Sequence, residues 1–176
     1  METERFSLAR AVEQHEQAKI DLKIKEVEQQ VAKAQEQYDA NVETAGKLEL
    51  KEELEKTAAN LLSTGFRVAT VHPSFRPEFV FLESDKNKPN LCSTSEYYLS
   101  LIWSPHSSVD RFSLSVITNG EEVSVISRYY PKNGKKELEF RRNFQVEGIN
   151  LDEMHQTLFD AYKFATDGPE KGEPVS

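Results

Sequence analysis

The sequence has little cysteine, little glycine and no long apolar run. Its single cysteine, Cys92, cannot form an intramolecular disulfide or supply a cysteine-rich zinc site. The seven glycines are scattered, which excludes a glycine-rich phosphate-binding loop. No stretch approaches the roughly 18 apolar residues of a membrane helix, and no apolar signal segment follows the polar start, Met1 to Arg5. We therefore expect an intracellular protein of the cytoplasm or nucleus, with no membrane partner and no cofactor or metal.

Positive charge is also scarce. The 176 residues include 22 lysines and arginines against 30 acidic residues, so the formal net charge is −8. Neither half of the chain is basic, which argues against a broad surface for duplex DNA. Charged residues make up 30% of the chain and apolar residues 38%, a balance typical of one folded domain with an elongated, solvated extension.

Residues for catalysis are present but not grouped. The four histidines, His15, His72, His106 and His155, show no metal-ligand spacing such as i, i+4 on one helix. Cys92 lies in a polar stretch with no nearby base, which is typical of an ordinary loop thiol. If the protein were an enzyme, His72, His106 and Cys92 would be the first candidates, but the pattern predicts no enzyme.

The N-terminal segment has the clearest pattern. Between Phe6 and Gly46 there is no proline and no other glycine, and apolar residues recur at alternating spacings of four and three, the seam of a coiled coil. We predict that the seam mediates self-association, because a long polar helix must pack this stripe to be stable; the alternative is folding back on the same chain. The predicted oligomerisation residues are Ile20, Ile24, Val27, Val31, Ala34 and Tyr38, and the seam continues past Asn41 to Ala45 and Leu48.

The seam has a polar residue near its end. Asn41 occupies one seam position, where it would either select the pairing register or mark the place at which the seam weakens. Gly46 predicts a bend, followed by a second amphipathic helix over residues 47–63 that ends at Gly65; the alternative is a helix that continues straight through. We divide the chain into a coiled-coil helix (1–46), a head (47–167) and a flexible tail (168–176).

Beyond Gly65 the apolar period changes to that of strands. Residues 66–71, 79–82 and 97–103 read as strands, with a polar loop over 85–90. Two Asn-Gly pairs, at 119–120 and 133–134, predict tight hairpins between three further strands. These turns would place Val116 opposite Val123, and Tyr129 opposite Leu138. A last helix begins after the N-cap Asn150. The predicted fold is α+β: a coiled-coil helix, then a small head with an antiparallel sheet of five or six strands flanked by helices.

The predicted hairpins also define a polar sheet face. On it Arg111 would face Arg128, and Arg128 would face Glu139. This face is either a surface that binds an anion or a protein partner, or a solvated face relieved by Glu139. On the apolar face Arg142 interrupts the pattern, which predicts a bulge or the end of the sheet there. The candidate partner-binding residues are Arg111, Arg128, Tyr130, Lys132, Lys135, Lys136 and Arg141.

The order of elements resembles known families. A coiled-coil helix followed by a small α+β head is similar to the RWD-type heads of kinetochore and monopolin subunits, and the element count resembles the small, acidic, dimeric secretion chaperones. We therefore predict a non-enzymatic oligomeric adaptor whose helix assembles copies or partners and whose head binds another protein. The alternatives are single-stranded nucleic-acid binding through the Arg/Lys/Tyr face, and a chaperone-like acidic dimer.

Overall fold

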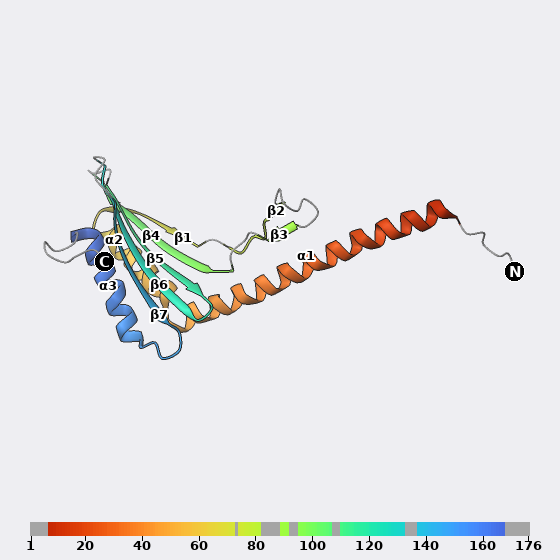
Figure 1. Cartoon of the computed structure of the whole chain (residues 1–176). Helices are drawn as coiled ribbons and strands as arrows, with labels where there is room; N and C mark the ends of the chain where they lie inside the picture. The colour runs from red at the N-terminus through yellow and green to blue at the C-terminus, as the bar shows by residue number, and fades with distance from the viewer. Residues whose placement is uncertain are drawn as a thin grey trace. The chain divides into compact units, whose positions relative to one another are not determined.

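The protein has the α+β architecture predicted from the sequence (Figure 1). In this computed structural model, residues 7–72, 74–81, 89–91, 95–106, 110–132 and 137–167 are described. The chain divides into two compact units, residues 1–36 with 75–94, and residues 37–74 with 95–176. The boundary falls within the first helix, so that helix contributes to both units.

Two helices form the N-terminal third. Helix α1 runs over Leu8–Lys47 and helix α2 over Leu50–Ser63. The predicted break is present, but Gly46 still belongs to α1 and the change of direction occurs at Glu49, which has a left-handed φ of 54°. Leu48 and Leu50, the residues on either side of Glu49, are both buried in the core, so the chain turns between two core residues. Helix α2 ends before Gly65, whose φ of 90° is the conformation that favours glycine at a helix C-terminus.

Five antiparallel strands form the main sheet, in the order β1-β4-β5-β6-β7. Each strand hydrogen-bonds to the strands beside it, so β1 and β7 are the two edges. Because successive side chains alternate, the sheet has an apolar face, which contains Leu101, Leu114 and Val125, and a polar face, which contains Ser100, Ser115 and Arg128. The strands are Phe66–Val71, Tyr97–Pro105, Arg111–Asn119, Glu122–Tyr130 and Leu138–Gln145.

The first hairpin has a different register from the predicted one. Val116 pairs with Val125, not with Val123, because Asn119 still pairs with Glu122 and the two loop residues are Gly120 and Glu121. Of these two loop residues only Gly120 has a positive φ, at 60°, as in a type II′ turn and unlike the predicted type I′. A shift of two residues leaves every side chain on its predicted face.

This shift changes one important pair. Arg111 lies opposite Tyr130, and Arg128 lies opposite Ser113, so the predicted direct Arg111–Arg128 opposition was wrong. The second hairpin has the predicted register, with Tyr129 opposite Leu138, although its Asn133–Gly134 turn lies outside the described residues.

A short separate sheet belongs to the other unit. Strand β2, Phe79–Phe81, pairs antiparallel with β3, Pro89–Leu91, and neither strand pairs with the main sheet. The second predicted strand is therefore present, but the loop predicted over 85–90 contains the start of β3. Its proline and polar residues hid this short strand from the sequence pattern.

The core of the head lies between the apolar sheet face and two helices. Helix α3, Leu151–Asp167, packs on β5, β6 and β7, while α2 packs on β1 and β4 (Figure 1). The N–H of Asp152 donates to Oδ1 of Asn150 at 2.9 Å, which confirms the predicted N-cap. Trp103 is buried at the centre, with ring centroids 5.7 Å from Phe112 and 5.5 Å from Tyr162. Leu151, the first residue of α3, is exposed.

Arg142 neither bulges nor ends the sheet. It pairs in register with Val125, and β7 continues to Gln145. Its guanidinium Nη2 lies 2.8 Å from Oε1 of Glu153 on α3, and its guanidinium carbon Cζ lies 5.0 Å from the ring centroid of Phe144. An arginine is accommodated on the apolar face here because β7 is an edge strand and α3 supplies the counter-charge.

Candidate functional site

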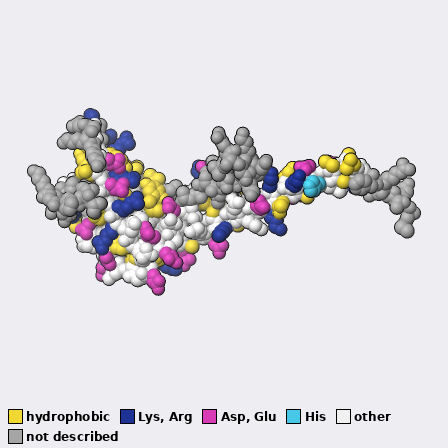
Figure 2. Space-filling model, viewed as in Figure 1, with side chains coloured by type: hydrophobic (Ala, Val, Ile, Leu, Met, Phe, Trp, Pro, Cys, Tyr) yellow, Lys and Arg dark blue, Asp and Glu magenta, His cyan; other side chains and the backbone are white. Residues whose placement is uncertain are grey.

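The outer part of the α1 seam, from Ile20 to Ala34, exposes large apolar side chains. Ile20 and Ile24 are 50% and 51% exposed, while Val27, Val31 and Ala34 are partly buried. Acidic, basic and hydrophobic side chains are all visible on the surface of this helix (Figure 2). Local ion pairs such as Glu16–Lys19, at 2.8 Å, lie on the same helix, and the hydrogen bond from Lys19 lowers the pKa of Glu16.

The inner part of the seam belongs to the head. Asn41 is 1% exposed; its Nδ2 donates to the Ser95 carbonyl at 2.7 Å, and its Oδ1 accepts from the Gly120 N–H at 2.8 Å. Asn41 therefore connects α1 by hydrogen bonds to the residue before β4 and to the β5–β6 turn. This role within the head was not among the two interpretations of the sequence, a residue that selects the pairing register or one that marks the weak end of the seam. Tyr38 packs edge-on against Tyr97, with ring centroids 5.8 Å apart. Ala45 and Leu48 join the core.

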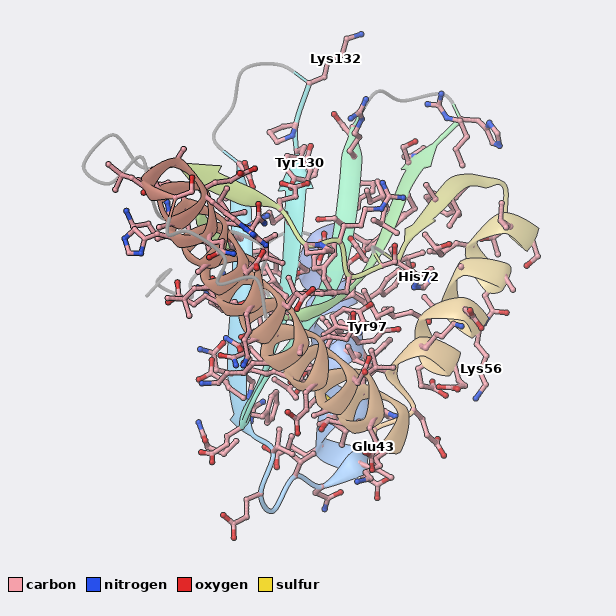
Figure 3. The ribbon with its side chains drawn as sticks, turned by 90° about the vertical axis from the view of Figure 1, so that its right-hand side faces the viewer. Glu43, Lys56, His72, Tyr97, Tyr130 and Lys132 are labelled. Atoms are coloured by element: carbon pink, nitrogen blue, oxygen red, sulfur yellow. The ribbon has the colours of Figure 1, made fainter. Side chains whose placement is uncertain are left out.

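The polar sheet face holds a pocket of about 480 Å³. It brings together four of the seven predicted partner-binding residues, namely Arg111, Arg128, Tyr130 and Lys132. Tyr130 and Lys132 lie at the same end of the sheet, where Lys132 extends outward (Figure 3). Arg141 lies on the same face of edge strand β7, opposite Ile126, and does not line the pocket. Lys135 and Lys136 lie outside the described residues.

The pocket floor is a group of hydroxyls. The Oγ atoms of Ser100 and Ser115 are 2.9 Å apart, and the Tyr98 hydroxyl is 3.4 Å from the Ser115 Oγ. Ser100, Ser113 and Ser115 are all buried, although they lie on the polar face. Each serine hydroxyl can both donate and accept, so this floor can adapt to the polar group of a ligand.

The cations around the pocket differ in their partners. Arg128 Nε lies 2.7 Å from Glu139 and 3.4 Å from Glu137, and Arg141 shares Glu139 at 3.5 Å. Hydrogen bonds to Glu139 and then to Tyr130 raise the pKa of Arg128, so its charge is permanent. Within the described ranges, no ion pair joins an acidic side chain to Arg111 or to the Lys132 amine. These two positive charges are therefore available to a ligand.

A second cavity lies between α2, α3 and the sheet. It encloses about 390 Å³ on the apolar side, and its lining includes Leu54, Leu61, Leu158 and Phe159. Phe159 is 55% exposed, although it is a large aromatic residue. His155 also lines the cavity, and its buried Nε2 has no hydrogen-bond partner in the part of the chain that the structure describes.

Among the described side chains, no three His, Cys, Asp or Glu residues converge in a way that could hold a metal ion. Cys92 lies outside the described ranges. None of the helices seen in those ranges has the length and apolar character needed to cross a membrane.

Sequence reasoning missed part of the pocket. Tyr98, Ser100 and Ile102 line it from β4 and were not expected there. Successive side chains of a strand alternate between its two faces, so Tyr98, Ser100 and Ile102 lie on the face opposite to Leu99 and Leu101. The missing information was that β4 lies beside β5, because the two strands are joined by a longer connection than a tight hairpin.

Comparisons with known proteins add no family. Neither a protein-family model, nor a curated protein, nor a solved structure matches this chain.

Proposed function

We propose that this protein is a non-enzymatic assembly and adaptor protein, in which α1 pairs with α1 of a second copy and the head binds another protein. The observation that carries the proposal is the exposed outer seam, with Ile20 and Ile24 each about half exposed on one helix. Burying each isoleucine in a helix pair would stabilise the assembly by about 1–3 kcal/mol. A single chain does not gain this free energy, because both side chains stay in contact with water.

The composition of α1 supports pairing. Over residues 8–36 the helix is rich in charged side chains, and isolated polar helices have little stability of their own. A 4-3 repeat is the pattern that winds two or more helices around a shared seam. The β-branched residues at both seam positions leave the number of helices and their orientation open.

The experiment that tests the proposal compares two signals on dilution. Helicity by circular dichroism at 222 nm reports mostly on the helices, and near-ultraviolet dichroism reports on buried Trp103. We expect dilution to reduce helicity, as the unpaired residues 8–36 lose structure, while the tryptophan signal stays constant. The molar mass in solution is measured on the same samples. If the helicity does not change with concentration and the molar mass is that of one chain throughout, the assembly proposal fails.

A chaperone-like acidic dimer is the second candidate, and one observation favours it. The cavity between α2 and α3 is lined largely by apolar side chains, and the half-exposed Phe159 is among its lining residues. Contiguous exposed apolar surface is typical of sites that bind other polypeptides. Suppression of the aggregation of an unfolded client, lost on Phe159→Ser, would support this function; no suppression at any ratio would exclude it.

Nucleic-acid binding through the polar sheet face is less well supported. Glu137 and Glu139 lie beside Arg128, and Glu139 also lies beside Arg141, so two of the predicted cations are already neutralised. Binding of a phosphate backbone needs a track of free positive charge, and the net charge here is −8.

A further inference from the structure

We propose that the pocket on the polar sheet face binds a carboxylate side chain of an acidic peptide segment, with Arg111 as its main contact. This inference rests on the proposed function, because it identifies the kind of partner that the head recognises. It concerns the pocket alone and does not depend on how α1 pairs.

The first support is a pair of cations at one end of the pocket. Arg111 is exposed at the start of β5, and Lys132 follows the end of β6. Neither side chain has an ion-pair partner among the described residues, whereas Arg128 in the same pocket has two. Arg111 lies directly opposite Tyr130 in the strand register, and both residues line the pocket. An arginine so placed presents a planar fork of donors that fits a carboxylate.

The second support is the surface beneath them. The hydroxyls of Tyr98, Ser100 and Ser115 form a connected group, with Oγ of Ser100 and Ser115 only 2.9 Å apart. Such hydroxyls can rotate to donate to a carboxylate oxygen, as the polar groups of a binding pocket do. The pocket volume of about 480 Å³ is large enough for one or two side chains of a peptide.

The third support is the fixed position of the pocket's end. The Lys132 N–H donates to Oδ1 of Asp110 at 3.0 Å, and the Tyr129 hydroxyl donates to Oδ2 at 3.4 Å. Both carboxylate oxygens of Asp110 therefore already accept a hydrogen bond. These bonds hold the end of β6 next to the start of β5, and with them the charges of Lys132 and Arg111.

The acidic rim favours a short acidic peptide over a continuous phosphate backbone. Glu137 and Glu139 flank the pocket on the β7 side and would repel a continuous phosphate backbone. A single carboxylate can approach Arg111 from the side of the pocket away from β7. No acidic side chain among the described residues forms an ion pair with Arg111 there. Recognition of acidic motifs by unpaired arginines is a common mode of peptide binding.

The test is fluorescence polarisation with a labelled, capped tetraglutamate peptide and the full chain at low salt. We expect binding that Arg111→Gln weakens about tenfold, the loss that corresponds to one charge-assisted hydrogen bond. Arg111→Lys keeps the charge but not the fork, and we expect it to lose less. Lys56→Gln is the matched control: it removes one exposed cation from α2, far from Tyr130 and Lys132 in Figure 3, and should leave binding unchanged.

Three competitors separate the alternatives. Capped tetralysine should not displace the probe, and inorganic phosphate should displace it only weakly. The proposal is overturned if tetraglutamate does not bind, if Lys56→Gln weakens it as much as Arg111→Gln, or if phosphate binds as tightly. Preferential binding of an oligothymidylate would also overturn it, in favour of single-stranded nucleic acid. Molar mass measured on the same samples keeps the outcomes distinct, since a chain that associates without binding the peptide retains the assembly function.

Discussion

The two parts of the α1 seam share one apolar repeat and have different surroundings. In the outer part Ile20 and Ile24 are about half exposed, whereas in the inner part Asn41, Ala45 and Leu48 are buried against the head. The periodicity of a helix shows which side must be covered, but not what covers it. The same seam is therefore part of the core at one end and an exposed apolar surface at the other.

The largest expected difference between the two parts is in stability. Leu48→Ala removes a buried side chain from the head core and should lower the free energy of unfolding by about 2–5 kcal/mol. Ile24→Ala removes a half-exposed one and should change it by no more than about 0.5 kcal/mol when the chain is dilute enough to be unpaired. Urea denaturation followed by tryptophan fluorescence measures both. Equal losses would mean that the outer seam is also packed within the chain.

Asn41 offers a sharper test of the inner part. Asn41→Ala leaves the Gly120 N–H and the Ser95 carbonyl without their partner, which should cost about 2–4 kcal/mol. Amide exchange of Gly120 should accelerate more than that of residues in the middle of β5. If Asn41 instead acted as a polar layer between helices, the substitution would strengthen association and leave Gly120 exchange unchanged.

The tyrosines of the head extend the comparison to high pH. Burial raises the pKa of Tyr97 above its ordinary value of 10.0, with smaller contributions from Tyr38, Glu52 and Glu55. The folded state then holds this proton more tightly than the unfolded state, so stability is unaffected below about pH 10 and falls as the pH rises above it. Thermal melting between pH 8 and about 11 measures the fall, and Tyr97→Phe should reduce its slope. A slope identical in both proteins would remove Tyr97 from the explanation.

The junction of the inner seam with α2 should respond least. Glu49 adopts a left-handed conformation that costs a non-glycine residue about 1–2 kcal/mol. Glu49→Gly relieves this cost but gives the unfolded chain more freedom, so we expect a net stabilisation of less than about 1 kcal/mol. Glu49→Ala is the control and should not stabilise. A loss of stability with glycine would show that the Glu49 side chain contributes an interaction of its own.

Local patterns predicted much of the fold. The alternation of residues 66–71 predicted β1 with its observed bounds, and Asn150 and Gly65 correctly marked a helix start and a helix end. The second hairpin followed its predicted register. These features depend on neighbours a few residues apart, which is the range over which turn chemistry and periodicity act.

The errors arose where distant residues interact. The first hairpin turn is displaced by one residue at a place where Gly120 is bonded to Asn41, 79 positions earlier, and the Asn119 amide donates to Glu96. Arg142 fits on the apolar face because Glu153 of α3 lies 2.8 Å away. In the pocket, the sequence identified Arg111 and Tyr130 but not the β4 hydroxyls, since strand order is set by packing and not by any local signal.

The most direct measurement of the central proposal is the molar mass in solution of three proteins at one high concentration. The unchanged chain should have a multiple of 20.1 kDa, and the double variant Ile20→Ser/Ile24→Ser should have the mass of one chain. Leu22→Ser is the matched control, because Leu22 is 60% exposed on the same helix but lies off the seam, and it should keep the multiple. A mass of 20.1 kDa for the unchanged chain, or the same multiple for all three proteins, would contradict assembly through the outer seam.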